Sequence, residues 1–89
     1  MKAVVTVIGK DMVGILAKVT AICAENNVNV LEVSQSIMQE LFAMVMLVDI
    51  SKCTIPFSAL VDSLEQAGEA MGLKIHAMHE DVFNAMHRI

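Results

Sequence analysis

Residues 9–14, with the sequence GKDMVG, carry the residue types best suited to holding a small ligand. They follow a β-branched run and precede apolar residues at helical spacing, so they join a strand to the start of a helix. The N–H groups at a helix start lack partners and lie at the positive end of the helix dipole, which favours a carboxylate or phosphate. Gly14 would leave room there for a ligand or for another backbone. Tight packing of the turn would explain the same glycine, so both interpretations stay open.

The spacing of the other reactive side chains predicts no catalytic residues and no metal site. His76 and His79 differ in strand parity and should point to opposite faces, so they cannot readily chelate one ion. A site built from His79, His87 and a cysteine is the less favoured alternative to three surface histidines. Ser-His-Asp and Cys-His patterns are not readable, and a pairing of Asp11 with Glu32 would be a guess. Neither GxGxxG nor the Walker pattern is present, so we expect no cofactor and no enzyme.

Cysteine spacing and the absence of a leader-like segment point to the cytoplasm. Cys23 and Cys53 form no CxxC motif, and two thiols in a reducing compartment are more often free than paired. The N-terminus has no basic region followed by a long apolar stretch, so we expect no signal peptide. The longest apolar run, residues 41–48, is far shorter than the roughly 20 residues of a membrane helix. We therefore expect a cytoplasmic protein without a membrane partner.

Composition predicts one domain that associates with itself. The 89 residues leave room for a single domain. Hydrophobic residues make up 56% without glycine, whereas about 45–50% with glycine is usual. Small soluble proteins usually bury such a surplus in an interface, which predicts a homodimer. Six Lys and Arg against ten Asp and Glu give a net charge of −4, so nucleic acid is not an expected partner.

Hydrophobic periodicity predicts four strands and two helices. Strands are expected at residues 3–8, 28–38, 42–50 and 73–80, and helices at 12–26 and 57–71. Asp11 would cap the first helix, and Pro56 suits the first turn of the second. Gly72 would end the second helix. Asp81 could cap a short terminal turn carrying Val82, Phe83 and Met86.

Polar and apolar alternation predicts the order of the strands. Residues 3–8 and 42–50 are apolar on both faces and should be central, whereas 28–38 and 73–80 have one polar face and should be edges. Right-handed crossovers then favour an α+β, ferredoxin-like βαββαβ fold with an antiparallel sheet of order 4-1-3-2 and both helices on one face. The C-terminal tail or a second copy must cover the other face.

The stretch from Val5 to Gln35, VTVIGKDMVGILAKVTAICAENNVNVLEVSQ, resembles the ACT family of ligand-binding regulatory domains. The resemblance extends from residue 3 to about residue 80. The closing sequence HEDVFNAMHRI is similar to that of the small stand-alone bacterial and archaeal members. It implies an ACT-like domain at residues 1–80 and a C-terminal tail at residues 81–89, possibly with a short helix.

The resemblance implies a ligand-binding site between the first loop and the start of the second strand, where two domains meet. In the serine-binding type, a polar side chain on this loop and an Asn near the second strand hold the ligand. Those positions fall on Asp11 and Asn29 here, with Gly14 giving clearance. Gly9 stands where that type has a histidine, and Asp11 replaces an amide. An acid at residue 11 would repel a ligand carboxylate and could favour an amino group.

These inferences predict a homodimeric ACT module that binds an amino acid or related metabolite and regulates a protein partner without chemistry of its own. The alternative is an assembly or protein-interaction module with no ligand, and an enzyme is the third possibility. Thermal stabilisation by a ligand would separate the first two, because a ligand that binds only the folded state must stabilise it.

Overall fold

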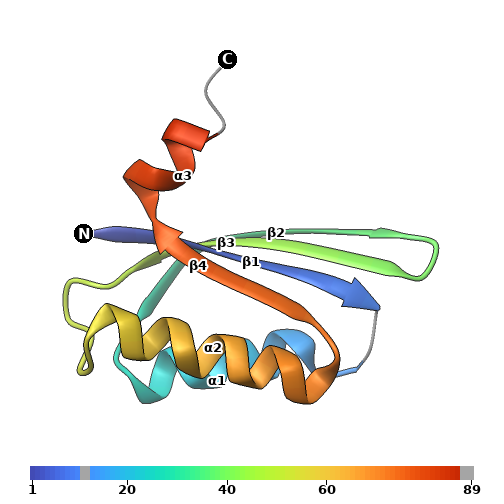
Figure 1. Cartoon of the computed structure of the whole chain (residues 1–89), viewed down its shortest axis with the longest axis horizontal. Coiled ribbons are helices and arrows are strands. Elements are labelled where there is room, and N and C mark those ends of the chain that lie inside the picture. The colour runs from blue at the N-terminus through green and yellow to red at the C-terminus, as the bar shows by residue number, and fades with distance from the viewer. Residues whose placement is uncertain (11–12, 87–89) are drawn as a thin grey trace.

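The computed structural model describes residues 1–10 and 13–86, which form a four-stranded sheet and three helices. The sheet is antiparallel with the order β2-β3-β1-β4, and α1 and α2 lie side by side on one of its faces (Figure 1). This arrangement confirms the predicted ferredoxin-like α+β fold. The elements in chain order are β1 (Lys2–Lys10), α1 (Ile15–Glu25), β2 (Asn29–Met38), β3 (Leu41–Asp49), α2 (Phe57–Met71), β4 (Lys74–His79) and α3 (Glu80–Met86).

The core lies between the sheet and the two long helices. The central strands β1 and β3 each present alternate residues to the helices, and α2 presents Leu60 and Leu64 in return. Met44 and Met46 are fully buried here, in agreement with their predicted role as core residues. Each such side chain contributes about 1.5–3 kcal/mol by leaving water, so these layers supply most of the driving force for folding.

Helix α1 begins later than the sequence predicts. Its first residue is Ile15, and its N-cap is Gly14, which has a φ of 91°. A residue in this left-handed conformation cannot continue a right-handed helix toward the N-terminus, so the helix starts after it. The prediction of a helix from residue 12 capped by Asp11 is therefore wrong in its start. Asp11 itself lies outside the described residues.

Strand β2 is exposed over most of its length, although only one wet face was predicted. From Leu31 to Met38 every residue is exposed, and Val30 is the last that is half-buried. The register shifts between Val30 and Glu32, which marks a β-bulge. The β2–β3 hairpin then extends past the helices, so neither of its faces is covered (Figure 1).

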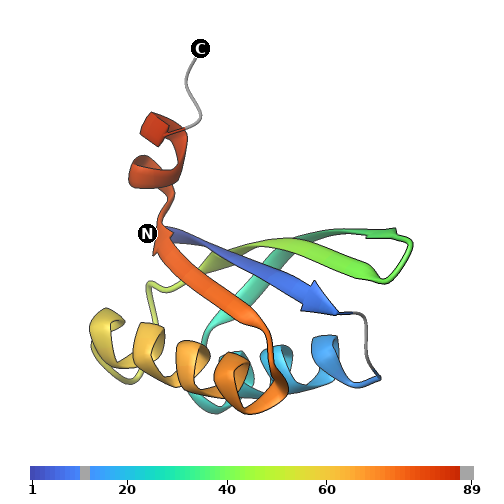
Figure 2. The same cartoon turned by 45° about the vertical axis from the view of Figure 1, so that its right-hand side comes forward.

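The sheet face opposite α1 and α2 carries exposed apolar side chains. Ile8, Leu41 and Val45 alternate with core residues of β1 and β3 and are 49%, 44% and 42% exposed. Helix α3 rises from the end of β4 away from α1 and α2 (Figures 1 and 2) and contacts β1 and β4, so these three side chains stay uncovered in one chain. Among the described helices, none combines the length and apolar character needed to cross a membrane.

Candidate functional site

Asn29, the first residue of β2, lines an open polar cavity at one end of the sheet. The cavity has a volume of about 530 Å³. Its walls come from the end of α1, the start of β2 and the end of β3 with the residues that follow. Its polar lining residues are Asn27, Asn29, Asp49, Ser51 and Lys52, accompanied by Ala24 and Val28.

Hydrogen bonds fix the end of α1 against the β3–α2 connection and thereby shape this cavity. Asn26 Nδ2 donates to the Ile22 carbonyl at 2.9 Å. Asn27 adopts a φ of 58°, which ends the helix, and its Nδ2 donates to the Lys52 carbonyl at 3.0 Å. The Thr54 N–H donates to the Asn26 carbonyl at 3.0 Å. The cavity is therefore built from main-chain anchors rather than from a free loop.

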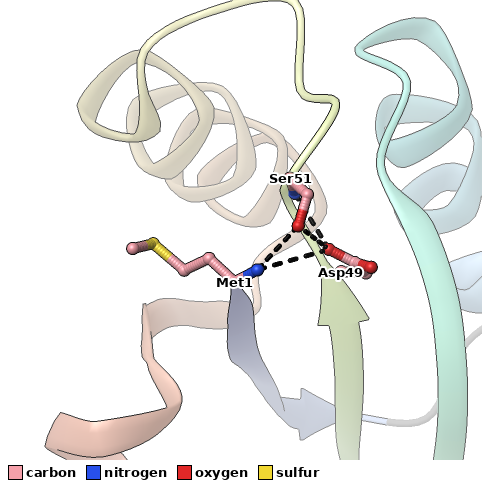
Figure 3. Close-up of polar contacts among 3 residues, drawn as sticks. All are labelled: Met1, Asp49 and Ser51. Carbon is pink, nitrogen blue, oxygen red and sulfur yellow. Dashed lines mark hydrogen bonds and ion pairs between the residues drawn. The ribbon is translucent and has the colours of Figure 1, made fainter.

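Asp49 is held in place as an ionised carboxylate at the edge of this cavity. Its Oδ1 accepts hydrogen bonds from the Ser51 hydroxyl at 2.6 Å and from the Ser51 N–H at 2.9 Å. The amino group of Met1 donates to Ser51 Oγ at 2.6 Å and lies 3.8 Å from the same carboxylate oxygen (Figure 3). The bond from the Ser51 hydroxyl, followed by that from its N–H, holds the pKa of Asp49 below its ordinary value.

The cavity combines groups of opposite charge with amides. Asp49 can accept hydrogen bonds from an ammonium group, Lys52 can face a carboxylate, and the Asn29 amide both donates and accepts. The sequence analysis identified Asn29 but missed its polar neighbours. A signal was present, because Asp49-Ile50-Ser51-Lys52 places three polar residues at the end of an apolar strand.

Gly14 lies at the opposite end of α1 from Asn29. Eleven helical residues separate the two ends, which corresponds to about 16 Å at 1.5 Å per residue. One chain therefore does not bring Gly14 and Asn29 into one site, and Asp11, the third predicted binding residue, is not among the described residues. A Cβ built on Gly14 would have no atom within 4 Å, so crowding within the chain does not require glycine there. Its φ of 91° does.

Gly9 is glycine because β1 passes close to the turn between α2 and β4. A Cβ at this position would lie 2.5 Å from Leu73 Cδ2 and 3.3 Å from the Leu73 Cα. The backbone distance cannot be relieved by a side-chain rotation. A ligand-binding side chain at residue 9 would therefore need the turn to move.

The histidines and cysteines are separated by the fold. His76 is exposed, with Nδ1 4.0 Å from Glu65 Oε2, whereas His79 is half-buried and stacks on Phe57, so the prediction of a surface histidine is wrong for His79. Within residues 1–10 and 13–86, no cluster of three or more His, Cys, Asp or Glu is placed to hold a metal ion.

Both cysteines are free, as predicted. Cys23 is buried, and Cys53 is half-buried in the connection between β3 and α2. Burial, with a smaller effect of Cys53, raises the pKa of the Cys23 thiol. A thiol with a raised pKa is a poor nucleophile, so Cys23 acts as a core residue.

Comparisons with known proteins agree with this geometry. The ACT domain family model matches residues 2–78. A UPF0237 protein of Methanocaldococcus jannaschii is 51% identical over 88 residues, which cover 99% of this chain and 98% of that protein. A UPF0237 protein of Clostridium acetobutylicum is 46% identical over 89 residues, the full length of both chains.

Solved structures give the same fold. An ACT domain protein from Streptococcus pneumoniae superimposes with a TM-score of 0.81 at 36% identity, covering 98% of each chain. A formyltetrahydrofolate deformylase from Burkholderia mallei superimposes with a TM-score of 0.77 at 15% identity. That match covers 88% of this chain and 28% of the deformylase, and it concerns the fold alone.

Proposed function

The chain belongs to the ACT domain family of regulatory small-molecule-binding modules, and on this premise we propose that it binds an amino acid or a closely related metabolite as a homodimer. In this proposal the liganded dimer regulates a protein partner, and the chain catalyses no reaction of its own. It acts in the cytoplasm, where free amino acids reach millimolar levels or below and a modest affinity suffices.

The observation that carries the proposal is the composition of the cavity beside Asn29. An amino acid presents an ammonium group and a carboxylate a few ångströms apart. The cavity offers the Asp49 carboxylate and the Lys52 ammonium together with the Asn29 amide. Charge-assisted hydrogen bonds of this kind are about twice as strong as neutral ones, so a zwitterion is favoured over an uncharged metabolite.

Exposed apolar side chains on one side of the molecule support association through the β2 edge. Val33 and Ile37 pair with core residues of β3, so they point to the helix side, yet they are 41% and 57% exposed. Val13 and Leu16, at the start of α1, are exposed as well. Pairing of two β2 strands would cover these side chains and would satisfy the free backbone groups of the edge.

The same pairing supports a binding site shared between two chains. Lys10 pairs with Leu41, and Leu41 pairs with Met38, so residues 9–14 follow the end of the sheet where β2 finishes. Asn29 lies at the other end of β2. Two antiparallel β2 strands related by a twofold axis would set Asn29 of one chain near residues 9–14 of the other. Asp11, Gly14 and Asn29 would then contribute to one ligand site.

Calorimetric titration of the chain with the standard amino acids tests the proposal. Sedimentation equilibrium with and without the tightest ligand should show stronger association in its presence, because a ligand that bridges two chains favours the dimer by its differential affinity. An amino acid that binds without changing the dimer constant would place the site within one chain. A stable dimer that binds none of them would instead support an assembly module without a ligand.

A further inference from the structure

A second cavity shares Ser51 with the one beside Asn29 but has a different chemical character. Its volume is about 340 Å³, and its other lining residues are Met1, Ile50, Cys53, Ile55, Phe57 and His79. They come from the start of β1, the β3–α2 connection, the first residue of α2 and the end of β4. The Met1, Ser51 and Asp49 contacts form the partition between the two cavities (Figure 3).

Main-chain hydrogen bonds hold the walls of this cavity in place. The Ile50 N–H donates to the Met1 carbonyl at 2.9 Å, which fastens the β3 end to the start of β1. The Cys53 N–H donates to the Ile50 carbonyl at 3.1 Å, and so closes a turn between them. A pre-formed cavity spares a ligand part of the entropy cost of ordering its site.

His79 is the polar group of this cavity that lacks a partner. Its Nδ1 is buried and has no hydrogen-bond partner among the described residues. Its imidazole stacks on the Phe57 ring, with centroids 4.3 Å apart and the planes inclined by 29°. The Ser51 hydroxyl, by contrast, is already bonded to both Met1 and Asp49. A ligand that bonds to His79 Nδ1 would relieve an unsatisfied buried group, and such groups are rare in folded proteins.

From this geometry we propose that the cavity binds a small, neutral, bicyclic heteroaromatic molecule. Its rings pack against Phe57, Ile50 and Ile55, and its ring N–H donates to Nδ1 of His79, whose own proton is on Nε2. The volume is about twice the roughly 150 Å³ of a cavity that holds benzene, which matches two fused rings.

Charge separates this cavity from the one beside Asn29. No charged side chain lines it, and the Met1 amino group is bonded to Ser51 and paired with Asp49. A free amino acid would lose the hydration of two charges without ionic partners, which is unfavourable. A neutral ring with one donor loses little hydration and gains stacking and one hydrogen bond.

Titration of the isotope-labelled full chain with indole, followed by amide NMR spectra, tests the proposal. Indole is a neutral bicycle with one N–H, and indene has the same shape without it. We expect saturable shifts at Cys53, Phe57 and His79 and only small shifts at Gly14. Indene should bind about five- to tenfold more weakly, because one hydrogen bond is lost.

Two substitutions locate the binding. Ile55→Phe fills the cavity and should weaken indole binding by about tenfold or more, whereas Ile37→Phe, the same change on β2, should leave it unaltered. His79→Phe keeps a ring but removes the nitrogen, so indole and indene should bind it equally. Asn29→Ala should not change indole affinity, which keeps this site distinct from the proposed amino acid site.

Three results would overturn the proposal. The first is the absence of saturable shifts at the cavity residues in a spectrum that shows a folded chain. The second is equal affinity of the unmodified chain for indole and indene. The third is unchanged indole affinity in Ile55→Phe. If Ile55→Phe fails to fold, Phe57→Leu gives the same readout, because it removes the ring that the ligand is proposed to contact.

Discussion

Asn29 and Asp49 are directly paired in the register of β2 and β3, and both line the polar cavity. Paired residues of antiparallel strands project to the same face of the sheet, so the amide and the carboxylate are held side by side. Because Ser51 donates two hydrogen bonds to Asp49, this carboxylate is fixed before a ligand arrives. The pair therefore gives the proposed site one mobile polar group and one fixed charge.

Asn29→Ala should weaken amino acid binding without unfolding the chain. Truncation leaves a ligand polar group unpaired, which costs about 1–3 kcal/mol and corresponds to about 5- to 150-fold in Kd. Asn29 is exposed at the start of an edge strand, so the melting temperature should change little. Calorimetric titration measures the effect, and Gln35→Ala removes another exposed amide from the same strand as the matched control. Equal affinities of the two variants would move the site away from Asn29.

Gly14→Ala should destabilise the fold because of backbone conformation, not crowding. A Cβ at φ 91° is strained by about 1–2 kcal/mol, although it would meet no atom within 4 Å. For a domain of this size, 1 kcal/mol lowers the melting temperature by about 4–8 °C. Gly14→Asn is the matched variant, since Asn tolerates the left-handed region better, and it should retain more stability. Thermal unfolding that finds Ala as stable as Gly would contradict the observed conformation.

Asp49 should make the free energy of unfolding depend on pH on the acid side. Its folded-state pKa is lowered, so the ionised group stabilises the fold at pH values above the unfolded pKa of about 4. That contribution is lost as pH falls through the lower folded-state pKa. Urea unfolding at a series of pH values should show a shallower acid decline for Asp49→Asn. Asp62→Asn, on the exposed face of α2, is the control, and identical pH profiles for Asp49→Asn and the unmodified chain would contradict the prediction.

The sheet order was predictable because alternation records which strands are covered on both faces. The strands around Val5 and Met46 are apolar on both parities, and they are the two central ones. The start of α1 was not predictable to within a turn, because the positive φ of Gly14 is a three-dimensional feature that a helical pattern does not record. The exposure of β2 also escaped prediction, since no pattern states how far a hairpin extends beyond its helices.

The candidate site was only partly predictable for a related reason. Asn29 was found through family resemblance, but its neighbours Asp49 and Lys52 reach the same cavity through strand pairing and a loop. Residues about 20 positions apart acquire a common site only when the register is known. His79 was read as a surface residue because parity assigns a face but does not show that Phe57 covers it.

Val33→Lys should weaken the proposed homodimer. Val33 points to the helix side of the β2 edge and is 41% exposed, so a lysine there is tolerated by one chain but places a charge in the paired interface. Charged residues at strand edges oppose edge-to-edge pairing, and an increase of about tenfold or more in the dimer dissociation constant is expected. Sedimentation equilibrium at several concentrations measures it.

Val45→Lys provides the matched control for the dimer, because Val45 is 42% exposed but lies on the opposite sheet face. If the chains pair through β2, this substitution should leave the dimer constant near that of the unmodified chain. If they pair through the open sheet face around Ile8 and Leu41, Val45→Lys should disrupt the dimer and Val33→Lys should not. In that case Asn29 of one chain would not lie beside residues 9–14 of the other, and the shared amino acid site would have to be abandoned. The two lysine variants thus test the interface and the ligand site together.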